Sequence, residues 1–313
     1  MKNLSLYQNM EYFKNKTLII SPVHPYLVSE LKRLRYKVEY SPSIKYIDLE
    51  KKISSQELLI LRSGIRIDKN IINKAKKLKY IIRAGSGLDN IDVTTAIKNN
   101  IKVFNLPNLN AVSVAEFAFG LIISTSRNIV KADKELRKNI WNKPNHYGFQ
   151  LKDKTLGIIG LGNIGTNIAK IAKGFSMNII ANVQNKSKKR TSSVKLVSLD
   201  NLLKNSDFIT LNVPLTNDTK NLLNKKNCKL LRKNSILVNL SRGGVVNEEV
   251  LYRLLKDKLI FRAATDVFLH EKRNNKLFKL ENIIVTPHIG AMTYDAQKNI
   301  AKEVIKKVIN FKF

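Results

Sequence analysis

The sequence predicts an α/β protein built from two doubly wound domains, each with a parallel sheet. Short β-prone runs alternate with helical patterns along almost the whole chain, which is typical of stacked βαβ units. The alternation comes in two series, and 313 residues suit two domains better than one core. We therefore expect a cleft between the domains, with ligands beyond the carboxyl ends of the strands.

The first series contains five expected strands. They are 17–20, 37–40, 58–61, 80–83 and 101–104, and helical patterns such as 68–79 and 92–99 lie between them. After Pro107 the apolar spacing predicts one long helix from about 112 to 139, followed by a loop at 141–148.

The second series contains six expected strands, at 155–159, 177–183, 207–213, 235–240, 260–267 and 282–286. The first of them leads into the glycine-rich turn Gly160-Leu-Gly162-Asn-Ile-Gly165, and apolar residues then recur at helical spacing. In such a turn the first glycine permits a tight bend and the second lets a pyrophosphate approach the backbone. The third lets the helix and strand pack closely. This stretch predicts a dinucleotide site, with the phosphates at the N-terminus of the helix.

Composition limits the possible functions. No apolar run is long enough to span a membrane, and the N-terminus does not have the features of a signal peptide. A single cysteine, Cys228, excludes an internal disulfide and a cysteine metal cluster, and we expect no metal site and a cytoplasmic protein. The net charge of +32 would suit nucleic acid, but the lysines are spread evenly, so we expect solvated faces that attract anionic substrates and no nucleic-acid partner.

Several polar side chains stand where expected strands end. Arg242, Glu271 and His288 are the candidates for chemistry among them, and Arg62, Ser63 and the run Gly85-Ser86-Gly87 follow strands of the first series. An arginine can hold a carboxylate and polarise a carbonyl, while a histidine beside a carboxylate can donate a proton near neutral pH. These residues suit hydride transfer coupled to proton transfer on a 2-oxo acid.

These motifs together resemble the D-isomer-specific 2-hydroxyacid dehydrogenases over nearly the full length, from about Thr17 to Ile309. The matching pieces are Leu61-Arg-Ser63, Arg83-Ala-Gly-Ser-Gly-Leu-Asp-Asn-Ile-Asp92, Asn110 with Ser113-Val-Ala-Glu116, the glycine turn, Val213-Pro-Leu-Thr216 with Thr219, Asn239-Leu-Ser-Arg-Gly243, Asp266-Val-Phe268, Glu271 and Pro287-His-Ile-Gly290.

The resemblance implies a flavodoxin-like substrate domain, 1–106 with 292–313, and a Rossmann cofactor domain, 107–291. It implies that Arg242 binds and polarises the substrate, that His288 is the acid/base and that Glu271 is its partner. Arg62, Ser63, Gly85, Ser86, Gly87 and Asn110 would receive the substrate carboxylate. The implied cofactor-binding residues are Gly160, Gly162, Asn163, Ile164, Gly165, Val183, Val213, Pro214, Thr219, Leu240, Asp266, Gly290 and Ala291.

Within the family the chain is most similar to the phosphoglycerate dehydrogenases of serine biosynthesis, in a short form that we expect to lack a regulatory C-terminal domain and its feedback control. The resemblance also implies a homodimer formed through the cofactor domains, and we expect Trp141 to be buried against the partner. Two alternatives stay open: a hydroxypyruvate/glyoxylate reductase, and a non-enzymatic nicotinamide-sensing transcriptional corepressor of the same fold.

The choice between NAD and NADP also stays open. An acidic residue is expected at the end of the second cofactor-domain strand, and Val183 stands there instead. Without that carboxylate the ribose loses its usual acceptor and a 2′-phosphate is no longer repelled. The basic residues Lys186, Lys188, Lys189 and Arg190 follow, which makes NADP use plausible.

Overall fold

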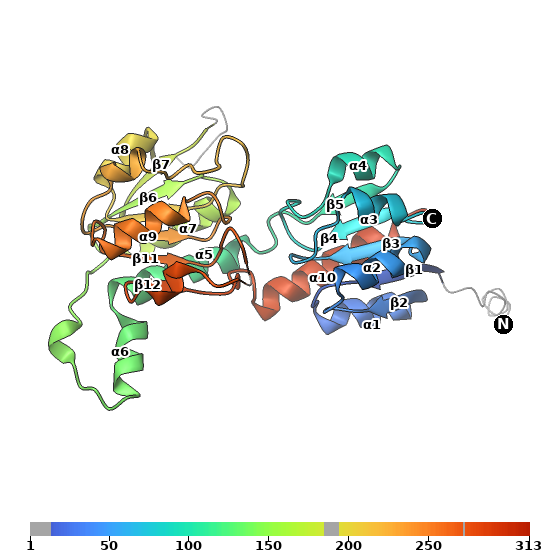
Figure 1. Ribbon diagram of the computed structural model, residues 1–313, viewed down its shortest axis with the longest axis horizontal. Helices are drawn as coiled ribbons and strands as arrows, with labels where there is room; N and C mark the ends of the chain where they lie inside the picture. The colour runs from blue at the N-terminus through green and yellow to red at the C-terminus, as the bar shows by residue number, and fades with distance from the viewer. Residues whose placement is uncertain (1–13, 185–193, 272) are drawn as a thin grey trace, which may run out of the picture. The chain divides into compact units, whose positions relative to one another are not determined.

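The computed structural model describes residues 14–184, 194–271 and 273–313. The chain divides into two compact units, Met1–Asn110 with Thr293–Phe313 and Ala111–Met292. Each unit has its own parallel sheet, one of five strands and one of seven, so the predicted α/β class with two parallel sheets is confirmed (Figure 1).

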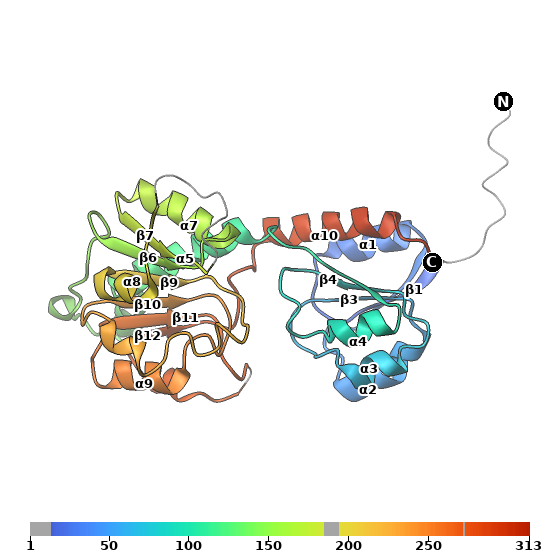
Figure 2. The same cartoon turned by 90° about the horizontal axis from the view of Figure 1, so that it is seen from above.

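The first unit has the strand order β2-β1-β3-β4-β5, which is the flavodoxin-like order. Its strands are β1 (Lys14–Ile19), β2 (Tyr36–Tyr40), β3 (Leu58–Leu61), β4 (Tyr80–Arg83) and β5 (Lys102–Asn105). One face of the sheet is covered by α1 (Pro25–Arg33) and α10 (Tyr294–Ile309), and the other by α2 (Tyr46–Lys52), η1 (Ile53–Ser55), α3 (Lys69–Lys74) and α4 (Val93–Lys98) (Figure 2). Strand β3 is buried along its whole length because both faces of the sheet are covered.

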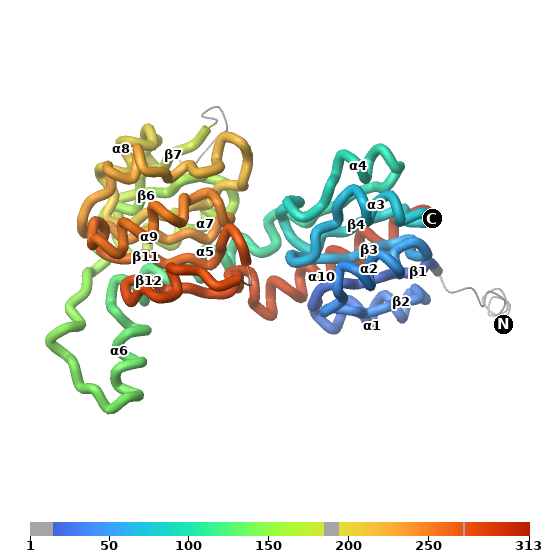
Figure 3. Tube along the Cα trace, viewed as in Figure 1, coloured from blue at the N-terminus to red at the C-terminus, as the bar shows by residue number. Residues whose placement is uncertain are grey.

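Helix α10 completes this unit from the far end of the chain, as Figure 3 traces. Thr293 caps the helix, since its Oγ1 accepts a hydrogen bond from the Ala296 amide at 3.2 Å. Ile300, Val304 and Val308 recur at helical spacing and are buried in one cluster with residues of α1. The packing of α10 on α1 therefore joins the last helix to the first unit.

The second unit has the order β12-β11-β10-β9-β6-β7-β8. From β6 the chain adds β7 and β8 on one side of the sheet and then β9 to β12 on the other, so the strand order changes sides between β6 and β9. Its strands are β6 (Thr155–Ile159), β7 (Asn178–Asn182), β8 (Lys195–Leu196), β9 (Phe208–Leu211), β10 (Ile236–Asn239), β11 (Arg262–Thr265) and β12 (Ile283–Val285). Helices α5 (Ala111–Ser126) and α7 (Asn163–Gly174) contribute to one core, and α8 (Leu199–Asn205), η3 (Asn227–Leu230) and α9 (Glu248–Lys256) to the other. Short 3₁₀ turns η2 (Lys143–Asn145) and η4 (Lys276–Lys279) lie in its loops. Such sheets bind ligands at the point where the strand order changes sides, so we expect a ligand site at the carboxyl ends of β6, β7 and β9.

The single long helix predicted from 112 to 139 is wrong. The structure has two helices here, α5 and α6 (Ile129–Leu136), separated at Asn128, which has a left-handed backbone with φ of 59°. Asparagine tolerates this conformation better than most residues, and here its Nδ2 donates to the Tyr147 carbonyl at 3.1 Å. After the break α6 runs in a different direction from α5 (Figure 1). The loop after α6 then returns, and the Phe149 amide donates to the Ser126 carbonyl.

Two other local expectations differ from the structure. The helical pattern at 68–79 contains the shorter helix α3, which Asp68 caps by accepting from the Ile71 amide at 3.1 Å. The two-residue edge strand β8 was not expected, because Lys195 and Leu196 give no alternating pattern. The basic residues Lys186, Lys188, Lys189 and Arg190 lie outside the described residues.

Candidate active site

In the turn after β6, each of the three glycines is needed for a different reason. Gly160 has φ of +91°, a left-handed conformation that side chains rarely adopt. A Cβ on Gly165 would lie 2.2 Å from the Gly160 carbonyl oxygen, so helix and turn approach too closely for any side chain. A Cβ on Gly162 would meet nothing within 4 Å. The second glycine therefore faces open space, as a close ligand requires.

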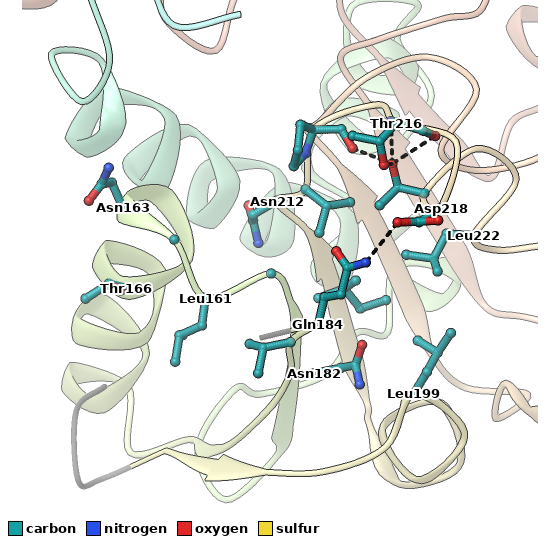
Figure 4. Close-up of a pocket in the computed structure, with 17 residues that line it drawn as sticks. Leu161, Asn163, Thr166, Asn182, Gln184, Leu199, Asn212, Thr216, Asp218 and Leu222 are labelled. Atoms are coloured by element: carbon teal, nitrogen blue, oxygen red, sulfur yellow. Dashed lines mark hydrogen bonds between the residues drawn. The ribbon is translucent and has the colours of Figure 1, made fainter. Parts of the chain in front are cut away.

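A cavity of about 1060 Å³ opens at this turn (Figure 4). Residues from the ends of β6, β7 and β9 line it, including Gly162, Asn163, Val183, Val213 and Thr219. Gly162 is the N-cap of α7 and has no side chain with which to cap the first amides of the helix. These features fit the pyrophosphate of a dinucleotide.

One polar atom of a residue in the cavity wall is buried without a partner in the described part of the chain. The Asn212 Oδ1 atom is buried and has no hydrogen-bond partner among the described residues, while its Nδ2 donates to Thr210 Oγ1 at 3.2 Å. Buried polar atoms normally have partners, so this acceptor is an exception next to the cavity. Asn212 was missed in the sequence, although its position directly after β9 could have indicated it.

Arg242 stands in the loop after β10, and the loop is fixed by buried polar contacts. Asn239 Oδ1 accepts from the Ser241 amide at 3.1 Å and from Ser241 Oγ at 2.7 Å. Arg242 Nη1 donates to the Ser241 carbonyl at 2.8 Å. A Cβ on Gly243 would lie 2.0 Å from the Phe268 carbonyl oxygen, so the Arg242 loop and the loop after β11 are in direct backbone contact.

His288 and Glu271 are in contact in the second unit. The His288 Nδ1 and Glu271 Oε1 atoms are 2.6 Å apart, and the two side chains are 32% and 41% exposed. This arrangement leaves Nε2 as the ring nitrogen that can face a substrate. His288 has a left-handed backbone with φ of 56°, a conformation that is uncommon outside glycine and that concentrates at functional sites.

The turn that carries His288 is held by Asp266. The Asp266 side chain is buried, and its carboxylate accepts from Thr286 Oγ1 at 2.6 Å. It also accepts from the amides of Ile289 and Gly290, both at 2.8 Å. The carboxylate thus bonds residues on both sides of His288 and fixes the turn around it.

The first unit holds the remaining predicted residues. Ser21 Oγ accepts from the Arg62 amide at 2.9 Å, and burial lowers the pKa of the Arg62 guanidinium. Ser86 Oγ donates to Asn110 Oδ1 at 3.3 Å, and the Ser86 carbonyl accepts from Asn105 at 2.6 Å. Ser63 is exposed beside Arg62. The structure thus places these residues in the loops after β3, β4 and β5.

Arg83 extends this group, although it was not among the predicted substrate residues. It pairs in register with Leu61, the residue before Arg62, so the two arginines stand at the ends of neighbouring strands. A Cβ on Gly85 would lie 1.7 Å from Arg83 Nη1, so the guanidinium rests directly on the Gly85 backbone. Two cations therefore stand at the carboxyl edge of this sheet.

Not all of the predicted cofactor residues lie on the cavity. Gly160, Gly162, Asn163, Val183, Val213, Pro214 and Thr219 line it, whereas Ile164, Gly165, Leu240, Asp266, Gly290 and Ala291 do not. Gln184, Thr216 and Asp218 also line it and were not predicted. Among the described residues, no group of acids, histidines or cysteines could hold a metal ion, and no helix there is long and apolar enough to cross a membrane.

Comparison with known proteins places this geometry in a family. Residues 119–290 match the family model of the D-isomer specific 2-hydroxyacid dehydrogenase, NAD binding domain. The chain is 42% identical over 94% of its length to a D-3-phosphoglycerate dehydrogenase of Methanocaldococcus jannaschii, of which it spans only 57%. It is also 42% identical over 83% of its length to a hydroxypyruvate reductase of Thermotoga maritima, of which it covers 86%.

A solved structure agrees with these relatives. An acyclic imino acid reductase in complex with NADPH and D-Arg is similar with a TM-score of 0.85 and 30% identity, over 94% of this chain and 96% of that one. The family matched by sequence and the fold matched by structure are the ones that the motifs implied. The chain belongs to the family of D-isomer-specific 2-hydroxyacid dehydrogenases.

Proposed function

We propose that the chain interconverts a D-2-hydroxy acid and its 2-oxo acid with a nicotinamide dinucleotide, as a cytoplasmic enzyme. The observation that carries this proposal is the 2.6 Å contact between His288 and Glu271. A histidine oriented by a carboxylate through one ring nitrogen can move a proton at the other. When bound, the nicotinamide supplies or accepts the hydride.

The residues of the second unit have separate roles in this proposal. His288 donates its Nε2 proton to the carbonyl oxygen during reduction and takes the proton back during oxidation. Glu271 holds the ring in the orientation that makes this possible. Arg242 pairs with the substrate carboxylate and polarises the carbonyl, because a guanidinium offers a planar fork of donors and a fixed charge.

We propose 3-phosphoglycerate as the hydroxy acid, and the arginines of the first unit favour it. The loops with Arg62, Ser63, Gly85–Gly87 and Asn110 would receive the carboxylate. A phosphorylated substrate carries a second anionic group, and the guanidinium of Arg83 on Gly85 provides a second cation for it. Arg62 stands at the end of the neighbouring strand β3 and is a further guanidinium of this unit.

A hydroxypyruvate or glyoxylate reductase is the second candidate, because the chain is as similar to the Thermotoga hydroxypyruvate reductase as to the phosphoglycerate dehydrogenase. A spectrophotometric panel separates the two. It tests 3-phosphohydroxypyruvate, hydroxypyruvate, glyoxylate and pyruvate, each with NADH and NADPH. We expect the highest kcat/KM with the phosphorylated acid.

An arginine variant sharpens the panel. Arg83→Ala should raise KM for 3-phosphohydroxypyruvate by about 10–100-fold, which is the range of one lost charged hydrogen bond, and leave hydroxypyruvate nearly unaffected. Arg66→Ala removes the same charge from an exposed position of the same unit and is the matched control. Equal losses on both acids would favour the reductase. Nucleotide binding without turnover of any acid would favour the corepressor.

We also propose that the protein is a homodimer that covers α6 and the loop after it. Trp141 and Tyr147 are 82% and 86% exposed, and Leu136 and Ile140 are about half exposed, so this apolar surface has no cover among the described residues. Trp141 is the only tryptophan, so its fluorescence reports on this surface alone. We expect a dimer in sedimentation and a red-shifted emission on dissociation. A fully active monomer at micromolar concentration would contradict the proposal.

A further inference from the structure

The residue that stands where a ribose-binding acid is expected cannot do that work. Val183 is half-buried and packs against the core formed by α5, β6 and α7. Its side chain has no polar atom, so it neither accepts a hydrogen bond from a ribose hydroxyl nor repels a phosphate. Other described residues of the cavity have polar side chains that could bind the adenine ribose.

Asp218 provides the missing carboxylate from a different loop. Among the described residues that line the cavity, it is the only one with an ionisable side chain, and no lysine or arginine lines the cavity there. Gln184, the second residue after β7, donates from Nε2 to Asp218 Oδ2 at 2.9 Å. Figure 4 shows the two side chains next to one another at the cavity, with their hydrogen bond drawn as a dashed line.

The loop that carries Asp218 is braced from within. Thr219 Oγ1 donates to the Pro214 carbonyl at 2.5 Å and accepts from the Thr216 amide at 2.7 Å. These bonds close the stretch from Pro214 to Thr219 into a compact turn with Asp218 at its edge. These bonds fix the loop, and the Asp218 carboxylate itself accepts the hydrogen bond from Gln184.

We propose that Asp218, oriented by the hydrogen bond from Gln184, binds the adenine ribose of the cofactor. Its carboxylate makes the enzyme prefer NAD(H) to NADP(H). The carboxylate accepts hydrogen bonds from the ribose hydroxyls, whereas a 2′-phosphate brings negative charge against it. This inference rests on the proposed function, since it concerns the dinucleotide of that reaction. Asp218, in the loop after β9, thus has the role that a carboxylate at position 183 would have.

The test measures binding, so that it does not depend on the substrate. Dissociation constants for NADH, NADPH and adenosine 2′-monophosphate are measured by calorimetry at one ionic strength, because salt screens exposed charges. The variants are Asp218→Asn and Gln184→Leu. Asp257→Asn is the matched control, since it removes the same charge from an exposed residue after α9 that does not line the cavity.

We expect the wild type to bind NADH at least about tenfold more tightly than NADPH, the ratio for about 1.4 kcal/mol. Asp218→Asn should bring the ratio near one, mainly by tightening NADPH and adenosine 2′-monophosphate. Gln184→Leu should move it part of the way, and Asp257→Asn should leave it unchanged. A wild type that prefers NADPH, or a ratio that Asp218→Asn does not change, would overturn this inference alone. A folded wild type that binds neither dinucleotide would overturn the proposed function.

Discussion

Replacing Asp266 by asparagine should loosen the turn that carries His288. The buried carboxylate accepts three hydrogen bonds, from Thr286 Oγ1 and from the amides of Ile289 and Gly290. An asparagine keeps one acceptor oxygen and turns its amide group toward one of these donors, which leaves a buried donor unpaired. Such a donor costs about 1–3 kcal/mol, and weakening the bonds that remain adds about 1 kcal/mol.

The expected loss is therefore about 2–4 kcal/mol in the second unit, equivalent to a fall in Tm of about 4–16 °C for a unit of this size. We also expect kcat to fall by about 10²-fold, because a displacement of the histidine of about 1 Å is enough for such a loss. Calorimetry and steady-state kinetics on the same preparation measure both. Thr286→Val removes one donor and keeps both amide bonds, so its cost should stay near 1 kcal/mol. A variant Asp266→Asn with the Tm and kcat of the wild type would refute the reasoning.

Three further predictions concern single side chains. His288→Gln should lower kcat by about 10²–10⁴-fold and leave the Kd for NADH unchanged, and Glu271→Gln should lose less; a folded His288→Gln protein with normal kcat would contradict this. Gly162→Ala should keep the wild-type Tm, since its Cβ meets open space, but weaken dinucleotide binding, whereas Gly165→Ala should lower Tm because its Cβ would lie 2.2 Å from a carbonyl oxygen. Equal Tm values for both glycine variants would contradict the geometry. Cys228 should resist Ellman's reagent in the native protein at about pH 8 and react once per chain after unfolding, because burial raises the pKa of its thiol to about 12.

Much of the fold could be predicted because its signals are local. The strands β3, β4 and β6 coincide with the apolar runs expected for them, since a strand covered on both faces needs consecutive apolar residues. The break at Asn128 could not be predicted, because apolar residues continue at helical spacing across it. The left-handed backbone there depends on the loop that returns to Asn128, and that contact is far away in the sequence.

For the candidate site, the positions of single residues could be predicted from the sequence, but the contacts between loops could not. The positions of Arg242 and His288 follow from the rule that ligands bind at the carboxyl ends of parallel strands. The contact between His288 and Glu271 and the hydrogen bond from Gln184 to Asp218 each join two loops, so no spacing in the sequence encodes them. Asp266 was expected to bind the cofactor, and that role stays a prediction. Its hydrogen bonds to the turn around His288 emerge only from the folded arrangement.

The packing of α10 on α1 has a consequence for synthesis on the ribosome. The second unit is continuous in sequence, so all of its strands have been synthesised before α10 is translated. The strands of the first unit are synthesised earlier. Leu27 and Leu31 of α1, however, pack in one cluster with Ile300, Val304 and Val308, which are added only when α10 is made. Of these two units, the one translated first therefore cannot finish folding until the second has been synthesised, and a nascent chain stalled before Tyr294 should expose this apolar face to chaperones.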